Sequence, residues 1–239
     1  MNTDGLKCLW KTVFGDSDAF IDSFFQIAYS PERCKYIAEG DQIVSALYWF
    51  DCEYAGGKLA YIYAVATDPN HRGKGLASRL LEETHNHLKA LGYAGTVLKP
   101  ANGLFPFYER LGYETCGYIR RFPAAAGSPV PIKELDTEAY AARRRALLPH
   151  NAVIQEGITL KFLHSFAKFY DAGDALVCTL PEENVIFEYL GDPDYAPGIL
   201  AALGISKAEI PTPGTDIPFA MHHPLNCTKI PGYLGITLE

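Results

Sequence analysis

The sequence lacks a long apolar run. No stretch approaches the roughly 20 apolar residues that a membrane-spanning helix needs. Near the N-terminus, Asp4 and Lys7 interrupt an amphipathic pattern where a signal peptide would have an uninterrupted apolar segment. We therefore expect a cytoplasmic protein that does not bind membranes.

Basic residues are in the minority. The 239-residue chain contains 21 Lys and Arg against 28 Asp and Glu, which gives a formal net charge of −7. Proteins that bind nucleic acids usually present a basic face, so this balance argues against a nucleic-acid partner. An acidic surface would instead attract a small cationic molecule.

Paired cysteines are also absent. The six cysteines contain no C-x-x-C pair, so we expect reduced thiols and neither a disulfide framework nor a metal site. Two neighbouring histidines, His222 and His223, lie on a predicted strand and would point to opposite faces, which prevents them from sharing a metal ion.

A glycine-bearing turn is the most informative feature that the sequence contains. The turn, His71-Arg-Gly-Lys-Gly-Leu-Ala77, follows a predicted strand at residues 59–65 and precedes a predicted helix at residues 76–91. Gly92 stands where a left-handed residue would end that helix. The unit is therefore predicted to be a strand, a loop and a helix.

The start of such a helix is suited to an anion. Its first N–H groups lack partners within the helix and carry the positive end of the helix dipole. Gly73 and Gly75 leave the backbone uncovered, and Arg72 and Lys74 add positive charge. A Walker loop would need Ser or Thr after Lys74, and a dinucleotide-binding loop would need glycine at Ser78. We therefore predict a pyrophosphate site of another kind.

Two motifs carry a family resemblance. Arg72, Gly75 and Ala77 satisfy the signature Arg-x-x-Gly-x-(Gly/Ala), and Asn102–Tyr113 is similar to a second signature, in which an Asn opens a short helix ending in Phe-Tyr-x-x-x-Gly-(Phe/Tyr). With both motifs in the right order, the chain resembles the GNAT superfamily of acetyl-CoA-dependent N-acetyltransferases.

The resemblance implies an α/β fold with a mixed sheet, the GNAT acyl-CoA acyltransferase fold. It also implies that acetyl-CoA binds as cosubstrate without a metal and that an acceptor amine attacks the acetyl group directly. The residues that would contact the coenzyme are Val65, Thr67, Arg72, Gly73, Lys74, Gly75, Leu76, Ala77 and Asn102.

The resemblance places the hydroxyl of Tyr108 near the coenzyme sulfur, as the acid that protonates the leaving thiolate. The same tyrosine falls on an apolar stripe with Leu104, Phe107 and Leu111, which is equally typical of a core residue. Both interpretations remain open from the sequence.

The general base is not identified by the sequence. The predicted strand 59–65 offers only Tyr61 and Tyr63, both on one face, and an ordinary tyrosine pKa near 10 makes either a poor base at neutral pH. Asp51 and Glu53 lie one strand earlier, where charges are usually solvated. The terminal carboxylate of Glu239 and a chain of water molecules are further alternatives.

The order of predicted elements divides the chain into two domains. Residues 1–122 form a GNAT domain with the acetyl-CoA site, residues 123–131 a proline-bearing linker, and residues 132–239 a smaller, degenerate GNAT-like domain. The first domain contains helices at 6–14 and 19–29, strands at 36–38, 43–54 and 59–65, the helix 76–91, a strand at 95–98, a helix opened by Asn102 and a strand at 113–122. The second contains helices at 137–148 and 158–170, strands at 175–180 and 185–190, a helix at 196–203 and a strand at 219–222.

Two details of the second domain follow from its charges. The segment 192–198, at the place of the glycine loop, is acidic and contains prolines, so we expect no second coenzyme site there. The run Arg143-Arg144-Arg145 is interpreted as the solvated face of a helix.

Three functional hypotheses follow, one of which treats the fold as a scaffold with no affinity for CoA. The first is an N-acetyltransferase that moves the acetyl group of acetyl-CoA to a primary amine of a small cationic acceptor, acting as a monomer or homodimer. The alternative is a non-catalytic acyl-CoA-binding sensor or interaction module, favoured by the missing carboxylate base. No motif names the acceptor.

Overall fold

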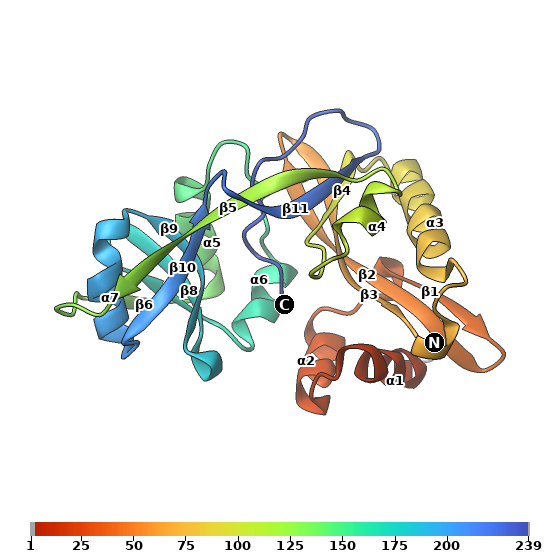
Figure 1. Cartoon of the computed structure of the whole chain (residues 1–239), viewed down its shortest axis with the longest axis horizontal. Helices are drawn as coiled ribbons and strands as arrows, with labels where there is room; N and C mark the ends of the chain where they lie inside the picture. Colours follow the sequence, from red (N-terminus) through yellow and green to blue (C-terminus); the bar gives the residue numbers. More distant parts are fainter. Residues whose placement is uncertain (1–2, 239) are drawn as a thin grey trace. The chain divides into compact units, whose positions relative to one another are not determined.

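The structure is a computed structural model that describes residues 3–238 (Figure 1). Its internal contacts divide the chain into two units. The first unit runs to Glu114 and also includes Met221–Ile230, while the second consists of Thr115–Ala220 and returns at Pro231. The division therefore falls inside two strands, β5 (Glu114–Ala125) and β11 (Ile217–Pro224), whereas the expected linker was residues 123–131.

The first unit contains the elements that the sequence predicts, in the predicted order. They are α1 (Thr3–Phe14), α2 (Asp18–Ile27), β1 (Cys34–Glu39), β2 (Gln42–Tyr54), β3 (Gly57–Thr67), α3 (Leu76–Ala90), β4 (Gly95–Leu98) and α4 (Phe105–Glu109). The sheet order is β1-β2-β3-β4-β11, in which β3 and β4 are parallel and the other neighbours antiparallel. The predicted mixed α/β architecture is confirmed.

Alternating side chains on β2 and β3 build two different cores. One face carries Tyr48, Phe50 and Tyr63, whose rings pack with Trp10 of α1 or Phe24 of α2. Tyr61 lies on the same face and packs with Phe50 and Tyr63. The aliphatic core on α3 includes Leu47, Trp49, Ala60 and Ile62 of the strands together with Leu80, Leu81 and Leu88 of the helix. Because successive strand residues point to opposite faces, Tyr61 and Tyr63 share one face as predicted.

Helix α4 begins later than the sequence analysis expects. Asn102 does not open it: the helix starts at Phe105, and its N-cap is Leu104, which makes no side-chain capping hydrogen bond. Gly103 between them adopts φ +81°, a left-handed conformation that places Asn102 in a separate turn. Pro106 then occupies the first helical turn, where its missing N–H has no helical partner to lose.

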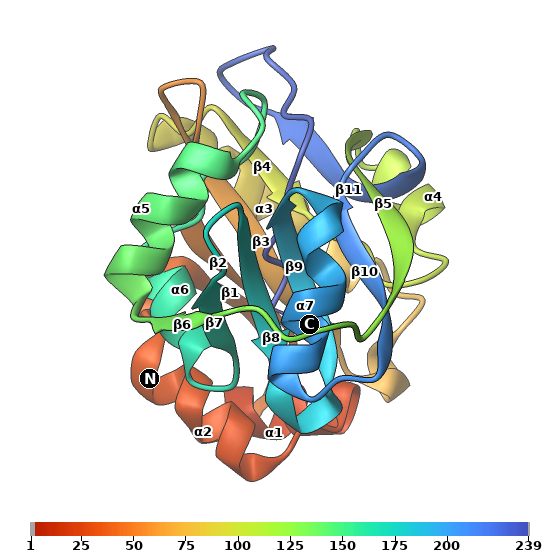
Figure 2. The same cartoon turned by 90° about the vertical axis from the view of Figure 1, so that its left-hand side faces the viewer.

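The second unit is a smaller α/β structure. Its elements are the remainder of β5, β6 (Lys133–Leu135), α5 (Thr137–Leu147), α6 (Ile158–His164), β7 (Lys168–Asp171), β8 (Ala175–Leu180), β9 (Val185–Gly191), α7 (Ala196–Leu203), β10 (Lys207–Pro213) and the start of β11. Strands β6 to β9 form an antiparallel sheet in sequence order, and β10 pairs with β5. Figure 2 shows α5 and α7 on either side of β8 and β9.

Two predictions for this unit are wrong, and one strand was not predicted. Residues 158–170 are not one helix, because α6 ends at His164 and Phe169 in β7 stacks on Tyr140, with ring centroids 4.0 Å apart. The strand β10 was not predicted, since it contains Pro211 and Pro213; it lies at a sheet edge, where proline is tolerated.

The second wrong prediction concerns Arg144, which is 1% exposed and not solvated. Its guanidinium donates two hydrogen bonds to Glu188, at 2.7 and 2.8 Å, while the hydroxyls of Tyr140 and Tyr233 each donate to the same carboxylate at 2.9 Å. Burial opposes the charge on Glu188, but Arg144 and these hydrogen bonds hold the pKa of Glu188 below its usual range. The cluster ties α5, β9 and the C-terminal segment together.

Among the described residues 3–238, no helix combines the length and apolar character required to cross a bilayer.

The buried cluster predicts unequal effects of two adjacent arginines. Arg144→Ala leaves the buried Glu188 carboxylate without its counter-charge and should lower the free energy of unfolding by about 3–5 kcal/mol. Arg145→Ala removes a half-exposed pair with Glu156 and should cost less than about 1 kcal/mol. Urea denaturation followed by circular dichroism measures both; equal effects would contradict the assignment.

Candidate active site

The strand β3 loses one of its two neighbours partway along its length. Its parallel ladder with β4 covers only Leu59–Tyr61, which pair with residues 95–97. Its antiparallel ladder with β2 continues as far as Thr67. The second half of β3 therefore has a ladder with β2 but not with β4, the arrangement expected where two strands part.

A β-bulge lies in this second half of β3. The register jumps from Tyr48↔Tyr63 to Ala46↔Ala66, so that Ala64 and Val65 together face a single residue of β2. Ala64 adopts φ +48°, which is uncommon for a residue with a Cβ atom. Such conformations are concentrated at functional sites. Nothing in the alanine-rich sequence of this strand predicts the bulge.

The glycine loop follows the end of β3, as predicted. Gly73 and Gly75 have φ values of +78° and +74°, and a Cβ atom at either would meet no other atom within 4 Å. Glycine is thus required for backbone conformation, and the space above the loop is open. The first bond of α3 joins Arg79 N–H to Gly75 O, so the N–H groups of residues 76–78 come before the helical ladder.

This loop forms one wall of a pocket of about 320 Å³. The pocket is lined by Thr67, His71, Arg72, Gly73, Gly75, Leu76, Ala77, Ser78 and Phe107. Phe107 comes from the second motif, so the fold brings the two motifs to one place. Six of the nine predicted coenzyme residues line the pocket.

The other three predicted residues lie elsewhere. Val65 packs against the aliphatic core on α3, Lys74 is exposed beside Glu39, and Asn102 is exposed in the turn before α4. Three lining residues were not predicted: His71, Ser78 and Phe107. Each lies inside or next to a motif, so proximity to the motif residues was the available signal.

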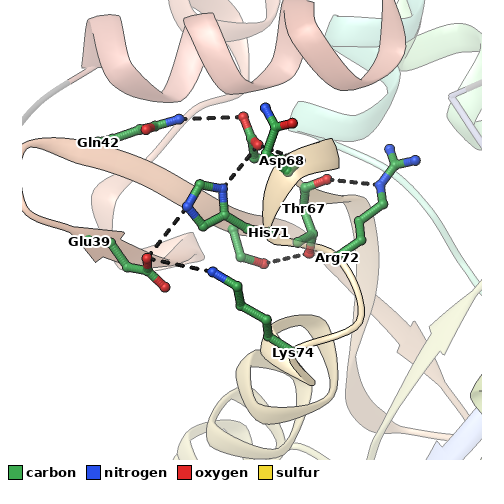
Figure 3. Close-up of polar contacts among 9 residues, drawn as sticks. Glu39, Gln42, Thr67, Asp68, His71, Arg72 and Lys74 are labelled. Carbon is green, nitrogen blue, oxygen red and sulfur yellow. Dashed lines mark hydrogen bonds and ion pairs between the residues drawn. The ribbon is translucent and has the colours of Figure 1, made fainter.

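The charged groups of the loop contact a carbonyl oxygen and a carboxylate of neighbouring residues (Figure 3). Arg72 donates from Nε to the carbonyl oxygen of Thr67 at 3.3 Å, while its terminal nitrogens point away from the strand. The ammonium group of Lys74 lies 3.9 Å from the carboxylate of Glu39. Both cations therefore remain at the loop, where an anion on its backbone would contact them.

Tyr108 is 6% exposed and lies directly behind the pocket residue Phe107, with ring centroids 5.0 Å apart. Its other side packs edge-on against Tyr113 at 5.5 Å. Tyr113 in turn accepts a hydrogen bond from Thr96 at 3.0 Å and lies 2.8 Å from Nε2 of His85. Tyr108 is thus a core residue by burial and a neighbour of the pocket by position.

The candidate bases have other partners. The carboxylate of Asp51 accepts a hydrogen bond from Tyr93 at 2.6 Å and lies 3.2 Å from the ammonium of Lys58. Glu53 is exposed on the hairpin, and Tyr61 and Tyr63 belong to the aromatic core. Glu239 lies outside the described residues.

The match to a family model decides the family. Residues 2–116 match the model described as an acetyltransferase (GNAT) domain. This part of the chain is a GNAT acetyltransferase domain. GNAT acetyltransferases transfer an acyl group from acyl-CoA, and the two motifs, the parted strands and the pocket all lie within this domain.

Solved structures share the fold of the GNAT domain and of the second unit. A GCN5-related N-acetyltransferase from Kribbella flavida is similar with a TM-score of 0.67 and 17% identity, over 94% of this chain and 70% of that one. One from Anabaena variabilis has a TM-score of 0.68 and 16% identity, over 94% and 71%. Eis1 from Mycobacterium abscessus has a TM-score of 0.67 and 12% identity, over 94% and 71%. No curated protein matches the sequence.

The histidine behind Tyr113 predicts a pH dependence of stability. Burial, and then the neighbouring His223, lower the pKa of His85 to about 3, whereas an unfolded histidine has a pKa of about 6.5. As the pH falls, the unfolded state therefore binds a proton at His85 before the folded state does. The contribution of neutral His85 to the free energy of unfolding is lost as the pH falls from about 6.5 toward about 3.

Urea denaturation between pH 7 and pH 4 measures this loss. In wild type, the proton taken up by His85 on unfolding contributes about 1.4 kcal/mol per pH unit to the slope of the unfolding free energy against pH. His85→Gln should reduce the slope by about this amount. The same change at the exposed His150 serves as the control. An unchanged slope in His85→Gln would contradict the buried neutral histidine.

Proposed function

We propose that the chain is an N-acetyltransferase that moves the acetyl group of acetyl-CoA to a primary amine of a small cationic acceptor. One observation carries the proposal: the glycine loop at the start of α3 opens beside the half of β3 that has parted from β4 and contains the bulge at Ala64. The predicted anion site thus lies next to a strand segment that has no ladder with β4. A long coenzyme with a diphosphate and two amides requires both features, one for the diphosphate and one for the amides.

The diphosphate of the coenzyme would rest on the N–H groups from Gly73 to Ala77. The terminal nitrogens of Arg72 supply forked contacts to the phosphate oxygens, and Lys74 adds a second positive charge. The pantetheine arm runs along β3 from Thr67 toward Ala64, where its amides replace the missing partner strand.

The reaction is a direct attack of the amine nitrogen on the acetyl carbonyl carbon. The carbonyl becomes an oxyanion, which the backbone N–H groups at the bulge of Ala64 stabilise. Collapse of this intermediate breaks the carbon–sulfur bond; the nitrogen loses a proton and the departing sulfur gains one. Tyr108, behind Phe107, is the proposed donor to the sulfur.

The second unit is proposed as a degenerate GNAT-like domain without a coenzyme site of its own. At the position of the glycine loop, the side chain of Asp192 accepts a hydrogen bond from its neighbour Asp194 N–H, so the turn is capped from within. The backbone N–H groups of Gly127 and Val130 bond to the carbonyls of Pro197 and Gly198 at the start of α7. An incoming diphosphate would meet negative charge there.

The anion site can be tested by reversing one charge. Arg72→Glu should weaken the binding of acetyl-CoA about a hundredfold, because it replaces a cation at the diphosphate by an anion. Titration calorimetry measures the Kd. Lys161→Glu, the same reversal on an exposed position of the second unit, should leave the Kd unchanged. Equal affinity in wild type and Arg72→Glu would refute the placement of the coenzyme.

Catalysis can be separated from binding at Tyr108. Tyr108→Phe should retain the wild-type Kd for acetyl-CoA and lower kcat by about a hundredfold or more, because only the proton donor is removed. Release of free thiol from acetyl-CoA in the presence of polyamines, aminoglycosides and amino acids measures turnover. Tyr36→Phe, at an exposed tyrosine, is the matched control. Binding without turnover on every amine would favour the non-catalytic sensor instead.

A further inference from the structure

His71 lies between two carboxylates that come from different strands. Its Nδ1 is 3.0 Å from Oδ1 of Asp68, which follows the end of β3, and its Nε2 is 3.4 Å from Oε2 of Glu39, the last residue of β1 (Figure 3). Only 18% of the histidine side chain is exposed. The imidazole therefore bridges the edge strand of the sheet and the first residue after β3.

Asp68 is itself fixed to the sheet. Its backbone N–H donates to the carbonyl of Val44 in β2 at 2.9 Å, and its carboxylate accepts hydrogen bonds from the N–H of Asn70 at 2.9 Å and from the side chain of Gln42 at 3.4 Å. The hydrogen bonds from His71 and Asn70 hold the pKa of this carboxyl below its usual range. His71 is thus bonded to a rigid, charged point.

The two glycines after His71 lie in open space. Gly73 and Gly75 both adopt positive φ, and their neighbourhood is open. Glycine loses more conformational freedom on ordering than any other residue, so this loop is entropically expensive to hold in the binding conformation. A loop ordered before the ligand arrives binds more tightly than one that must be ordered by it.

From this geometry we infer that His71 is a positioning residue of the coenzyme loop. By bridging Asp68 and Glu39, it fixes the direction in which the chain leaves β3, and so aims the N–H groups of residues 73–77 at the diphosphate. The inference rests on the proposed function, since it assumes that this loop binds the coenzyme.

Charge gives His71 a second effect on the same site. Two carboxylates beside an anion site would repel a diphosphate, and they lie next to the loop. An imidazole whose two nitrogens both face carboxylates can donate a hydrogen bond to each only in its protonated form. In that form it neutralises part of their charge, together with Lys74, which also faces Glu39.

Amide substitutions separate the two contacts. His71→Asn places an N–H donor near the position of Nδ1, where it reaches Asp68, while His71→Gln places one near Nε2, where it reaches Glu39. His71→Ala removes both contacts. Calorimetry with CoA gives the Kd of each variant, thiol release gives KM and kcat for acetyl-CoA, and the thermal midpoint monitors folding. His150→Ala, at an exposed histidine of the second unit, is the control.

We expect His71→Ala to raise the Kd for CoA and the KM for acetyl-CoA about tenfold, with kcat within about twofold of wild type. His71→Asn should recover most of the affinity, because it keeps the bond to the fixed Asp68. Adding Glu39→Gln to His71→Ala should recover part of it by removing a repulsive charge. A Kd within about twofold of wild type in His71→Ala would overturn the inference.

The outcome is distinguishable from a failure of the proposed function. If wild type itself does not bind CoA, the coenzyme assignment fails before any variant is compared. If His71→Ala lowers the thermal midpoint so far that this variant is unfolded, the Kd values of the His71→Asn and His71→Gln variants test the positioning role instead. A wild-type Kd in His71→Gln, which lacks the bond to Asp68, would refute the positioning role. A raised Kd in His71→Gln at an unchanged midpoint, with the Kd of His71→Asn near that of wild type, would support it.

Discussion

The hydrogen bonds of β3 set the constraint on which the rest of the first unit depends. Backbone N–H and C=O groups removed from water need partners, and a strand inside a sheet normally has one on each side. Beyond Tyr61, β3 keeps its ladder with β2 but not with β4. The bulge at Ala64 turns the backbone further at that point. At this point an extended ligand that contains amides could form the hydrogen bonds with β3 that a neighbouring strand would otherwise form.

The electrostatics of the loop are local and oppose the charge of the whole chain. The protein has a formal net charge of −7, yet Arg72 and Lys74 both lie at the start of α3, where the helix contributes its own partial positive charge. Glu39 lies beside Lys74, whereas Arg72 is held by the carbonyl oxygen of Thr67, which carries no net charge and leaves the positive charge of the guanidinium at the loop. One small region of an acidic chain can therefore carry the positive charge that an anion site requires.

Much of the first unit could be predicted from the sequence because its signals are local. The glycine loop, the strand before it and the amphipathic helix after it are each specified by residues close together in the chain. Six predicted coenzyme residues line one pocket for the same reason. Asn102 illustrates the limit: a good capping residue is displaced from the helix start by the left-handed Gly103.

The sequence by itself determined the loop, the elements of the first unit and the family resemblance, since each depends on neighbours in the chain. Only the tertiary structure decided the bulge at Ala64, the addition of β11 to the sheet beside β4, the burial of Arg144 against Glu188 and the strand pairing that ends α6 at His164. In every such case the deciding partner is distant in sequence. In the sequence, Arg144 is one of three consecutive arginines. Only the position of Glu188, 44 residues later, distinguishes it from its exposed neighbour Arg145.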